Sequence, residues 1–189
     1  MRLFVAVDPS AEVVEKVAAI RQVLMDTKAD VRWVKVEDYH VTVKFLGEVD
    51  EGLVGQLAER MTKAAAEVAA FELEVEGLSK FPERVGGGPV RVIISRVVSP
   101  DQRITRLHRL IDSAVGGMGL PMDTRVLVPH LTLGRVNSNR GLNRLLRLLE
   151  KHDLDFFGTF LVERVVLYQS VQADGGVKYA VVSRMELEA

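Results

Sequence analysis

HVTV at residues 40–43 and HLTL at residues 130–133 are two copies of one pattern, a histidine followed two positions later by a threonine. Both copies lie in apolar stretches rich in valine and leucine, which predict β-strands. Side chains alternate between the faces of a strand, so each histidine shares a face with its threonine, and the apolar residues point to the other face. The shared polar face is expected to carry His40, Thr42, His130 and Thr132. The copies start ninety residues apart, close to half the chain, which indicates a duplicated unit around one cleft.

The rest of the chain alternates between strand-like and helix-like patterns. Strands are expected at 3–7, 31–34, 40–46, 71–78, 90–98, 130–136, 156–168 and 177–187, and helices at 11–25, 53–70, 102–115 and 142–152. This order predicts a single bilobal domain over residues 1–189, with approximate halves at 1–88 and 89–189. Near the junction, Gly86–Gly88 lack the Lys-Ser/Thr of a P-loop, which favours a flexible connection over a phosphate loop.

Composition narrows the class of protein. The 189 residues are 48% hydrophobic and 27% charged, as expected for one soluble globular domain. The sequence has no membrane-spanning run and no signal-peptide pattern at its start, so we expect a cytoplasmic protein that does not use a membrane. No cysteine is present, which excludes disulfides and thiolate chemistry. The net charge of -1 argues against binding of long nucleic acid through many phosphates, and favours a short, local RNA contact.

Two histidines facing one cleft suit phosphodiester hydrolysis. A neutral imidazole accepts a proton from the attacking water while a protonated imidazole donates one to the departing sugar oxygen. The neighbouring threonine hydroxyls can donate hydrogen bonds to the non-bridging phosphate oxygens. We therefore expect His40 and His130 to act as acid and base, and Thr42 and Thr132 to bind the phosphate.

Other chemistries fit the repeated pair less well. A threonine nucleophile with a histidine base would need one triad with an orienting carboxylate, not two copies. A metal site is disfavoured because neither copy contains an Asp or Glu at a ligand spacing. The sequence thus predicts an enzyme that needs no metal or other cofactor and that resists chelators, with no obligatory protein partner evident.

Three residues beside the two copies are further candidates for the cleft or the core. Lys44 continues the face of Thr42 by alternation, so phosphate contact and solvation are equally open. Phe45 shares a face with the apolar residues and is expected in the core. Arg135 is a candidate phosphate ligand if a bulge near Gly134 turns it, because alternation otherwise points it to the core.

Residues outside the two copies receive simpler interpretations. His108 and His152 are expected at the surface. Candidates for stacking on a nucleobase are Tyr39, Phe45, Phe81 and Tyr168.

The sequence resembles the 2H phosphoesterase superfamily, and within it the RNA 2',3'-cyclic phosphodiesterase (2'-5' RNA ligase-like) family. The resemblance covers nearly the whole chain and includes both His-x-Thr motifs. It is carried by RLFVAVD at 2–8, VRWV at 31–34, YHVTVKFLGEV at 39–49, VPHLTLGR at 128–135, LYQS at 167–170 and GGVKY at 175–179.

The resemblance implies a bilobal α+β fold with pseudo-twofold duplication, in which two antiparallel β-sheets face a central cleft and helices lie outside. It implies that His40 donates a proton to the leaving 3' oxygen and that His130 accepts one from water, which leaves a 2'-phosphate. The partners implied are RNA ends or small nucleotides with a 2',3'-cyclic phosphate, and the same site can run backwards in 2'-5' RNA ligation. Two alternatives stay open: an inactive nucleotide-binding module, and a phosphodiesterase for 2'-5' oligoadenylate or ADP-ribose cyclic phosphate.

Overall fold

The computed structural model describes residues 1–83, 88–173 and 176–188. Of the predicted connection at Gly86–Gly88, the first two glycines lie outside the described residues. The strands are β1 (Arg2–Val7), β2 (Val31–Trp33), β3 (Val41–Glu48), β4 (Phe71–Phe81), β5 (Val92–Val98), β6 (His130–Val136), β7 (Phe156–Val162), β8 (Arg164–Ala173) and β9 (Gly176–Glu186). The helices are α1 (Ala11–Met25), α2 (Val54–Ala65), α3 (Arg103–Gly116) and α4 (Leu142–Lys151), with short 3-10 turns at Val36–Asp38 and Glu51–Leu53.

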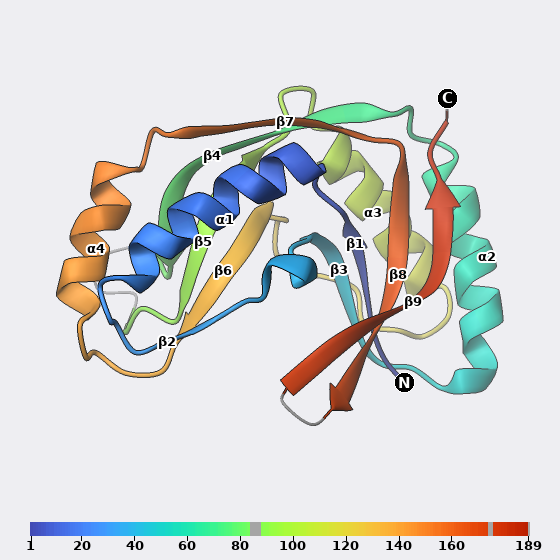
Figure 1. Ribbon diagram of the computed structural model, residues 1–189. Helices are drawn as coiled ribbons and strands as arrows, with labels where there is room; N and C mark the ends of the chain where they lie inside the picture. The colour runs from blue at the N-terminus through green and yellow to red at the C-terminus, as the bar shows by residue number, and fades with distance from the viewer. Residues whose placement is uncertain (84–87, 174–175, 189) are drawn as a thin grey trace.

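The elements form two lobes, which Figure 1 shows side by side. In the first lobe β3, β1, β8 and β9 lie in that order, and α2 and α3 pack against β9 and β3. In the second lobe the order is β7, β4, β5 and β6, with β2 paired to β6 and with α1 and α4 packed against β7 and β4. All these strand pairs are antiparallel, so the predicted bilobal α+β architecture of antiparallel strands with outer helices is confirmed.

The two lobes meet where the two His-x-Thr motifs meet. β3 pairs with β6 through Val41 and Leu131, which joins the two predicted sheets into one curled nine-stranded sheet. Both residues are fully buried. The apolar side of each motif is therefore anchored in the shared core, and the polar side is left facing outward from it.

The chain crosses between the lobes more than once. β4 comes from the first half of the sequence but lies beside β5 and β7, whereas β8 and β9 lie beside β1. The strand expected at 156–168 is in fact two strands that part at Glu163, because β7 pairs with β4 in one lobe and β8 with β1 in the other. The second helix ends at Ala65, five residues before the expected end.

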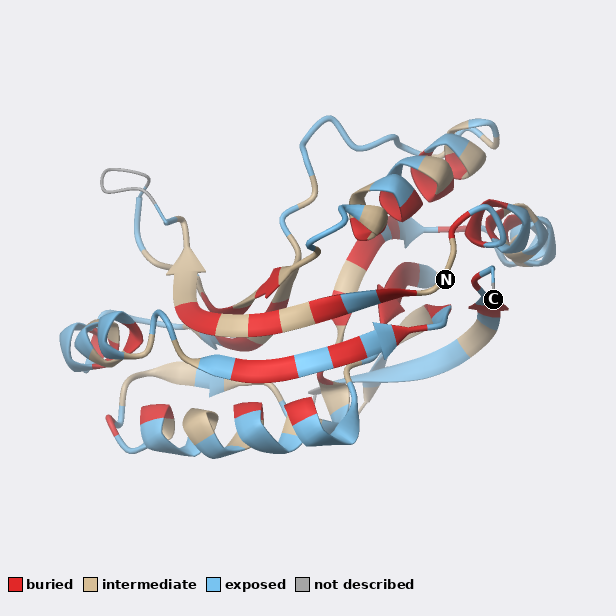
Figure 2. Cartoon of the chain, turned by 90° about the horizontal axis from the view of Figure 1, so that it is seen from above, coloured by how far each residue is buried: buried red, intermediate tan, exposed pale blue. Residues whose placement is uncertain are grey.

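Burial follows the patterns that define the elements. Ser10 caps α1 by accepting a hydrogen bond from the Val13 amide (3.4 Å), and Val13, Val17 and Leu24 form the buried side of this helix. Figure 2 shows buried residues along the strands and on the helix sides that face the sheet. Among the described residues, no helix combines the length and apolarity needed to cross a bilayer.

Candidate active site

A cleft of about 750 Å³ contains all five residues singled out by the sequence. Its lining includes His40, Thr42, His130, Thr132 and Arg135. The antiparallel pairing of Val41 with Leu131 brings each histidine toward the threonine of the other motif. The repeated motifs thus form one site with an approximate twofold arrangement, in which an imidazole and a hydroxyl approach from each lobe.

Each motif is followed by a β-bulge at the equivalent position. In β3, Val43 is the extra residue between the pairs that β1 makes with Thr42 and Lys44, and in β6, Leu133 is the extra residue beside β5. A bulge reverses the alternation of all later side chains. The second bulge turns Arg135 into the cleft, as expected if a bulge lay near Gly134.

The first bulge overturns two expectations. Phe45 is 67% exposed and lines the cleft, so its predicted place in the core is wrong. Lys44 is fully buried on the opposite side of the sheet, so neither phosphate contact nor solvation applies to it. Strict alternation failed at both residues because it takes no account of the bulge at Val43.

Both imidazoles are oriented in the same way. Nδ1 of His40 lies 2.8 Å from the carbonyl oxygen of Asp38, and Nδ1 of His130 lies 2.7 Å from that of Val128. A carbonyl only accepts hydrogen bonds, so Nδ1 carries the proton in each neutral ring. Nε2 is therefore the nitrogen that gains or loses a proton at the cleft.

The electrostatic surroundings of the two histidines differ. Burial lowers the pKa of both imidazoles. The nearby carboxylates of Asp8 and Asp38 oppose this effect at His40, whereas the Arg135 guanidinium lowers the pKa of His130 further. A positive charge on His130 also lowers the pKa of His40.

The cleft is positively charged although the chain as a whole is slightly negative. Its described lining includes four side chains with fixed positive charge and one carboxylate: Arg2, Arg32, Lys35 and Arg135 against Asp38. Such a local excess attracts anions independently of net charge. Sequence patterns did not single out Arg2 or Arg32, which reach the cleft only through the pairing of β1 and β2 with the motif strands.

Aromatic rings flank both histidines. The ring centroids of Phe4 and Tyr179 lie 4.9 and 5.2 Å from that of His40, and Phe81 lies 5.0 Å from His130.

Of the four expected stacking residues, Phe45 and Phe81 line the cleft. Tyr39 is buried in the core, and the hydroxyl of Tyr168 donates to Asp8. Tyr179 was not singled out, because it lies far from either motif in the sequence.

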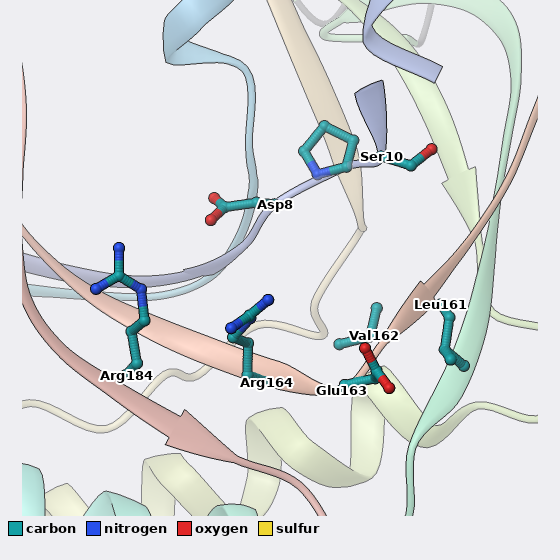
Figure 3. Close-up of a pocket in the computed structure, with 8 residues that line it drawn as sticks. Asp8, Ser10, Leu161, Val162, Glu163, Arg164 and Arg184 are labelled. Atoms are coloured by element: carbon teal, nitrogen blue, oxygen red, sulfur yellow. The ribbon is translucent and has the colours of Figure 1, made fainter. Parts of the chain in front are cut away.

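A second hollow, of about 570 Å³, lies at the start of α1 and beside the turn from β7 to β8 (Figure 3). Arg164 and Arg184 extend toward the side of Asp8, and Glu163 completes the charged lining. The two positive charges are matched by two carboxylates, and the described residues of the lining include no histidine. This hollow therefore offers neither the charge nor the acid and base groups of the cleft.

The other two histidines lie outside both hollows. His108 is buried, and its Nε2 lies 2.9 Å from Asp123, so its predicted surface position is wrong. His152 is partly buried and lies 2.6 Å from Asp155. Among the described residues, the group of side chains with the spacing to hold a metal ion is His108, Asp112 and Asp123, apart from the cleft.

Comparison with known proteins agrees with this geometry. A model of the 2'-5' RNA ligase superfamily matches residues 6–174. The chain is 29% identical to an RNA 2',3'-cyclic phosphodiesterase of Thermotoga maritima over all of this chain and 96% of the relative, and 32% identical to one of Archaeoglobus fulgidus over 95% and 96%.

Solved structures show the same fold. TT0787 of Thermus thermophilus superposes with a TM-score of 0.82 at 23% identity, over 99% of this chain and 98% of that one. E. coli LigT complexed with 3'-AMP gives 0.78 at 24% identity, over 98% and 97%. With the family model covering most of the sequence and both motifs in one cleft, the chain belongs to the 2'-5' RNA ligase superfamily.

Proposed function

We propose that this chain is an RNA 2',3'-cyclic phosphodiesterase, which opens the cyclic phosphate at an RNA or nucleotide end to a 2'-phosphate. The observation that carries the proposal is the meeting of two His-Thr pairs in one positively charged cleft. The activity named for the relatives in Thermotoga maritima and Archaeoglobus fulgidus supports the same reaction.

In the proposed step, His130 accepts a proton from water at Nε2 as the water oxygen attacks phosphorus. The bond from phosphorus to the 3' oxygen breaks in line, and His40 donates its Nε2 proton to that oxygen. The products are a 2'-phosphate and a 3'-hydroxyl group. Because each ring holds its Nδ1 proton on a backbone carbonyl, both rings present Nε2 for these transfers.

The unequal surroundings of the rings support this assignment of roles. An acid must carry a proton at the start of the reaction, and the carboxylates of Asp8 and Asp38 oppose the lowering of the His40 pKa by burial. A base must start neutral, and the Arg135 guanidinium favours the neutral form of His130.

The remaining site residues bind the phosphate. The hydroxyls of Thr42 and Thr132 approach from opposite lobes and donate to the two non-bridging oxygens, whose charge grows in the pentacoordinate state. Arg135, turned into the cleft by the bulge at Leu133, adds a charge-assisted hydrogen bond. No step in this scheme uses a metal ion.

The same site supports ligation in principle. When the 5'-hydroxyl of a second RNA takes the place of water, loss of its proton to His130 and protonation of the 3' oxygen by His40 produce a 2'-5' linkage. The substrate ends must then be held close, because water competes for the same phosphorus atom.

The proposal is tested with a short RNA ending in a 2',3'-cyclic phosphate, incubated with chelator and analysed so that 2'- and 3'-monoesters are resolved. We expect the 2'-monoester as the product, with full activity in chelator. A double variant, His40→Ala with His130→Ala, controls for contaminating nucleases. A 3'-monoester product, or activity that requires an added metal, would contradict the proposal.

A further inference from the structure

The segment from Pro121 to Pro129 joins α3 to β6 and leads directly into His130. Most of its residues are exposed. The carbonyl of Val128, near its end, accepts the Nδ1 proton of His130 at 2.7 Å. The carbonyl of Pro129 accepts a hydrogen bond from the Val97 amide of β5 at 3.2 Å, so the orientation of the His130 ring depends on this strand pairing as well as on the rest of the segment.

One cluster of charged side chains on the side of the sheet opposite the cleft holds the start of this segment. The Nζ atom of Lys44 lies 2.6 Å from Oδ1 of Asp112 and 3.2 Å from Oδ2 of Asp123, and it donates to the carbonyl of Pro121 at 3.1 Å. Its side chain has no exposed surface. Lys44 reaches this side because of the bulge at Val43, so the cluster is a direct consequence of the geometry of the first motif.

Asp123 is where the segment joins the cluster. Its carboxylate also receives the Nε2 proton of His108 at 2.9 Å, and its backbone amide donates to Asp112 at 3.0 Å. These contacts connect the segment to α3, which carries His108 and Asp112, and to β3, which carries Lys44. In the part of the chain that the structure describes, residues 124–127 make no hydrogen bond or ion pair, although Leu127 packs against the core.

The cluster has the composition of a metal site but is already occupied by a cation. The ligand atoms of His108, Asp112 and Asp123 lie within 4.8 Å of one another. The Lys44 ammonium lies within ion-pair distance of both carboxylates. Two carboxylates share one buried ammonium in this anchor, which is costly to break because removal of one partner leaves a buried charge unpaired.

We propose that Asp123 is a positioning residue for the reaction: anchored by Lys44, His108 and Asp112, it fixes the segment whose Val128 carbonyl orients the His130 ring. The anchor thereby links the strand of the first motif to the histidine of the second. This inference rests on the proposed role of His130, but it concerns the state of the ring and so has a readout of its own.

The test is Asp123→Asn, which removes the negative charge but keeps the backbone amide and nearly the same size. Nitrogen-15 NMR of the imidazole rings reports which nitrogen is protonated in the neutral form. We expect His130 to change from one tautomer, protonated at Nδ1, to a mixture, while His40 keeps its single tautomer. We expect kcat to fall about ten- to a hundredfold, as for other groups that orient a functional imidazole, and KM to change by less than about twofold.

Asp155→Asn is the matched control. Asp155 pairs with His152 at 2.6 Å, and its side chain is 44% exposed, against 40% for Asp123. It lies outside the lining of the cleft, so this variant should keep kcat and both ring tautomers unchanged.

A second variant separates the anchor from the ring without disturbing the cluster. Insertion of two glycines between Arg125 and Val126 leaves Lys44, Asp112 and Asp123 paired but slackens the connection to Val128. The same mixed tautomer and the same loss of kcat are expected.

The inference would be overturned if, in either Asp123→Asn or the insertion variant, His130 kept its single Nδ1-protonated tautomer and kcat stayed within about twofold of wild type. An equal loss of kcat in Asp155→Asn would also overturn the inference, because the loss would then not be specific to Asp123. The proposed function would survive both results, because it fails instead on His130→Ala retaining full activity.

Discussion

The strands β3 and β6 carry the same motif in the same local frame, yet they give their histidines different surroundings. In both, a bulge follows the threonine, the apolar residues enter one core, and Nδ1 of the histidine bonds a carbonyl two residues earlier. After the bulge the strands diverge, with Lys44 and Phe45 in β3 where β6 has Gly134 and Arg135.

This difference separates what the repeat provides from what its neighbours provide. The repeat places two imidazoles and two hydroxyls around one cleft, which is a symmetric arrangement. Burial lowers the pKa of both imidazoles, but nearby carboxylates oppose this effect at His40 whereas a guanidinium adds to it at His130. Duplication thus supplies geometry, and in the proposed mechanism the residues outside the motif supply the distinction between acid and base.

Removing either imidazole should have the largest effect. His40→Ala and His130→Ala should each lower kcat about 10²- to 10⁴-fold, because each removes one proton transfer in the same step. Initial rates on a cyclic phosphate end measure this, with circular dichroism as the check on folding. If one variant kept wild-type activity, the comparison between the two strands would fail.

Removing a threonine hydroxyl should have the next largest effect. Thr42→Ala and Thr132→Ala should each lower kcat roughly ten- to a thousandfold, since each hydroxyl is proposed to bind an oxygen whose charge grows in the transition state. Thr→Ser at the same positions keeps the hydroxyl and is the matched control. A change in KM alone would show that the hydroxyls bind substrate and transition state equally.

Arg135→Gln should reduce the difference between the electrostatic surroundings of the two histidines. We expect kcat/KM to fall about ten- to a hundredfold through loss of a charge-assisted hydrogen bond. Because the guanidinium lowers the pKa of His130, its removal should raise that pKa and move the acidic limb of the pH profile of kcat/KM to higher pH. Arg135→Lys, which keeps the charge, should leave that limb near its wild-type position, and an unshifted limb in Arg135→Gln would contradict the assigned asymmetry.

Gly134→Ala should affect stability more than activity. A Cβ atom at this position would lie 2.5 Å from Cγ1 of Val31 and 3.0 Å from the ring of Trp33. We expect a loss of about 1–3 kcal/mol in the free energy of unfolding, measured with urea, as for other overpacked sites. Gly55→Ala in α2 is the control, because a Cβ there meets no atom within 4 Å. Equal free energies of unfolding for the two variants would show that β2 moves to accommodate the added methyl group.

The elements of the fold were easier to predict from the sequence than their connections. Alternation and helical periodicity located β6 and α1 to the residue. The same patterns merged β7 and β8, because an apolar run does not reveal that the chain changes partner strand at Glu163.

The candidate site was predicted where the motif repeats and missed where the fold adds to it. The two histidines, two threonines and Arg135 line the cleft as expected. Lys44 and Phe45 were misplaced because a single extra residue in a bulge reverses the faces of a strand and leaves no mark in composition. Arg2 and Tyr179 reach the site from strands far away in the sequence, so only the pairing of β1, β8 and β9 reveals them.

Two similarly held imidazoles are proposed to act in opposite protonation states on one phosphorus atom. The most direct measurement is the pH dependence of kcat/KM for the wild type and for the residual activity of His40→Ala and His130→Ala. We predict a bell-shaped profile for the wild type, loss of only the acidic limb in His130→Ala and loss of only the basic limb in His40→Ala. Loss of the same limb in both variants, or a wild-type rate that stays constant between about pH 5 and 8, where histidine titrates, would contradict this division of roles.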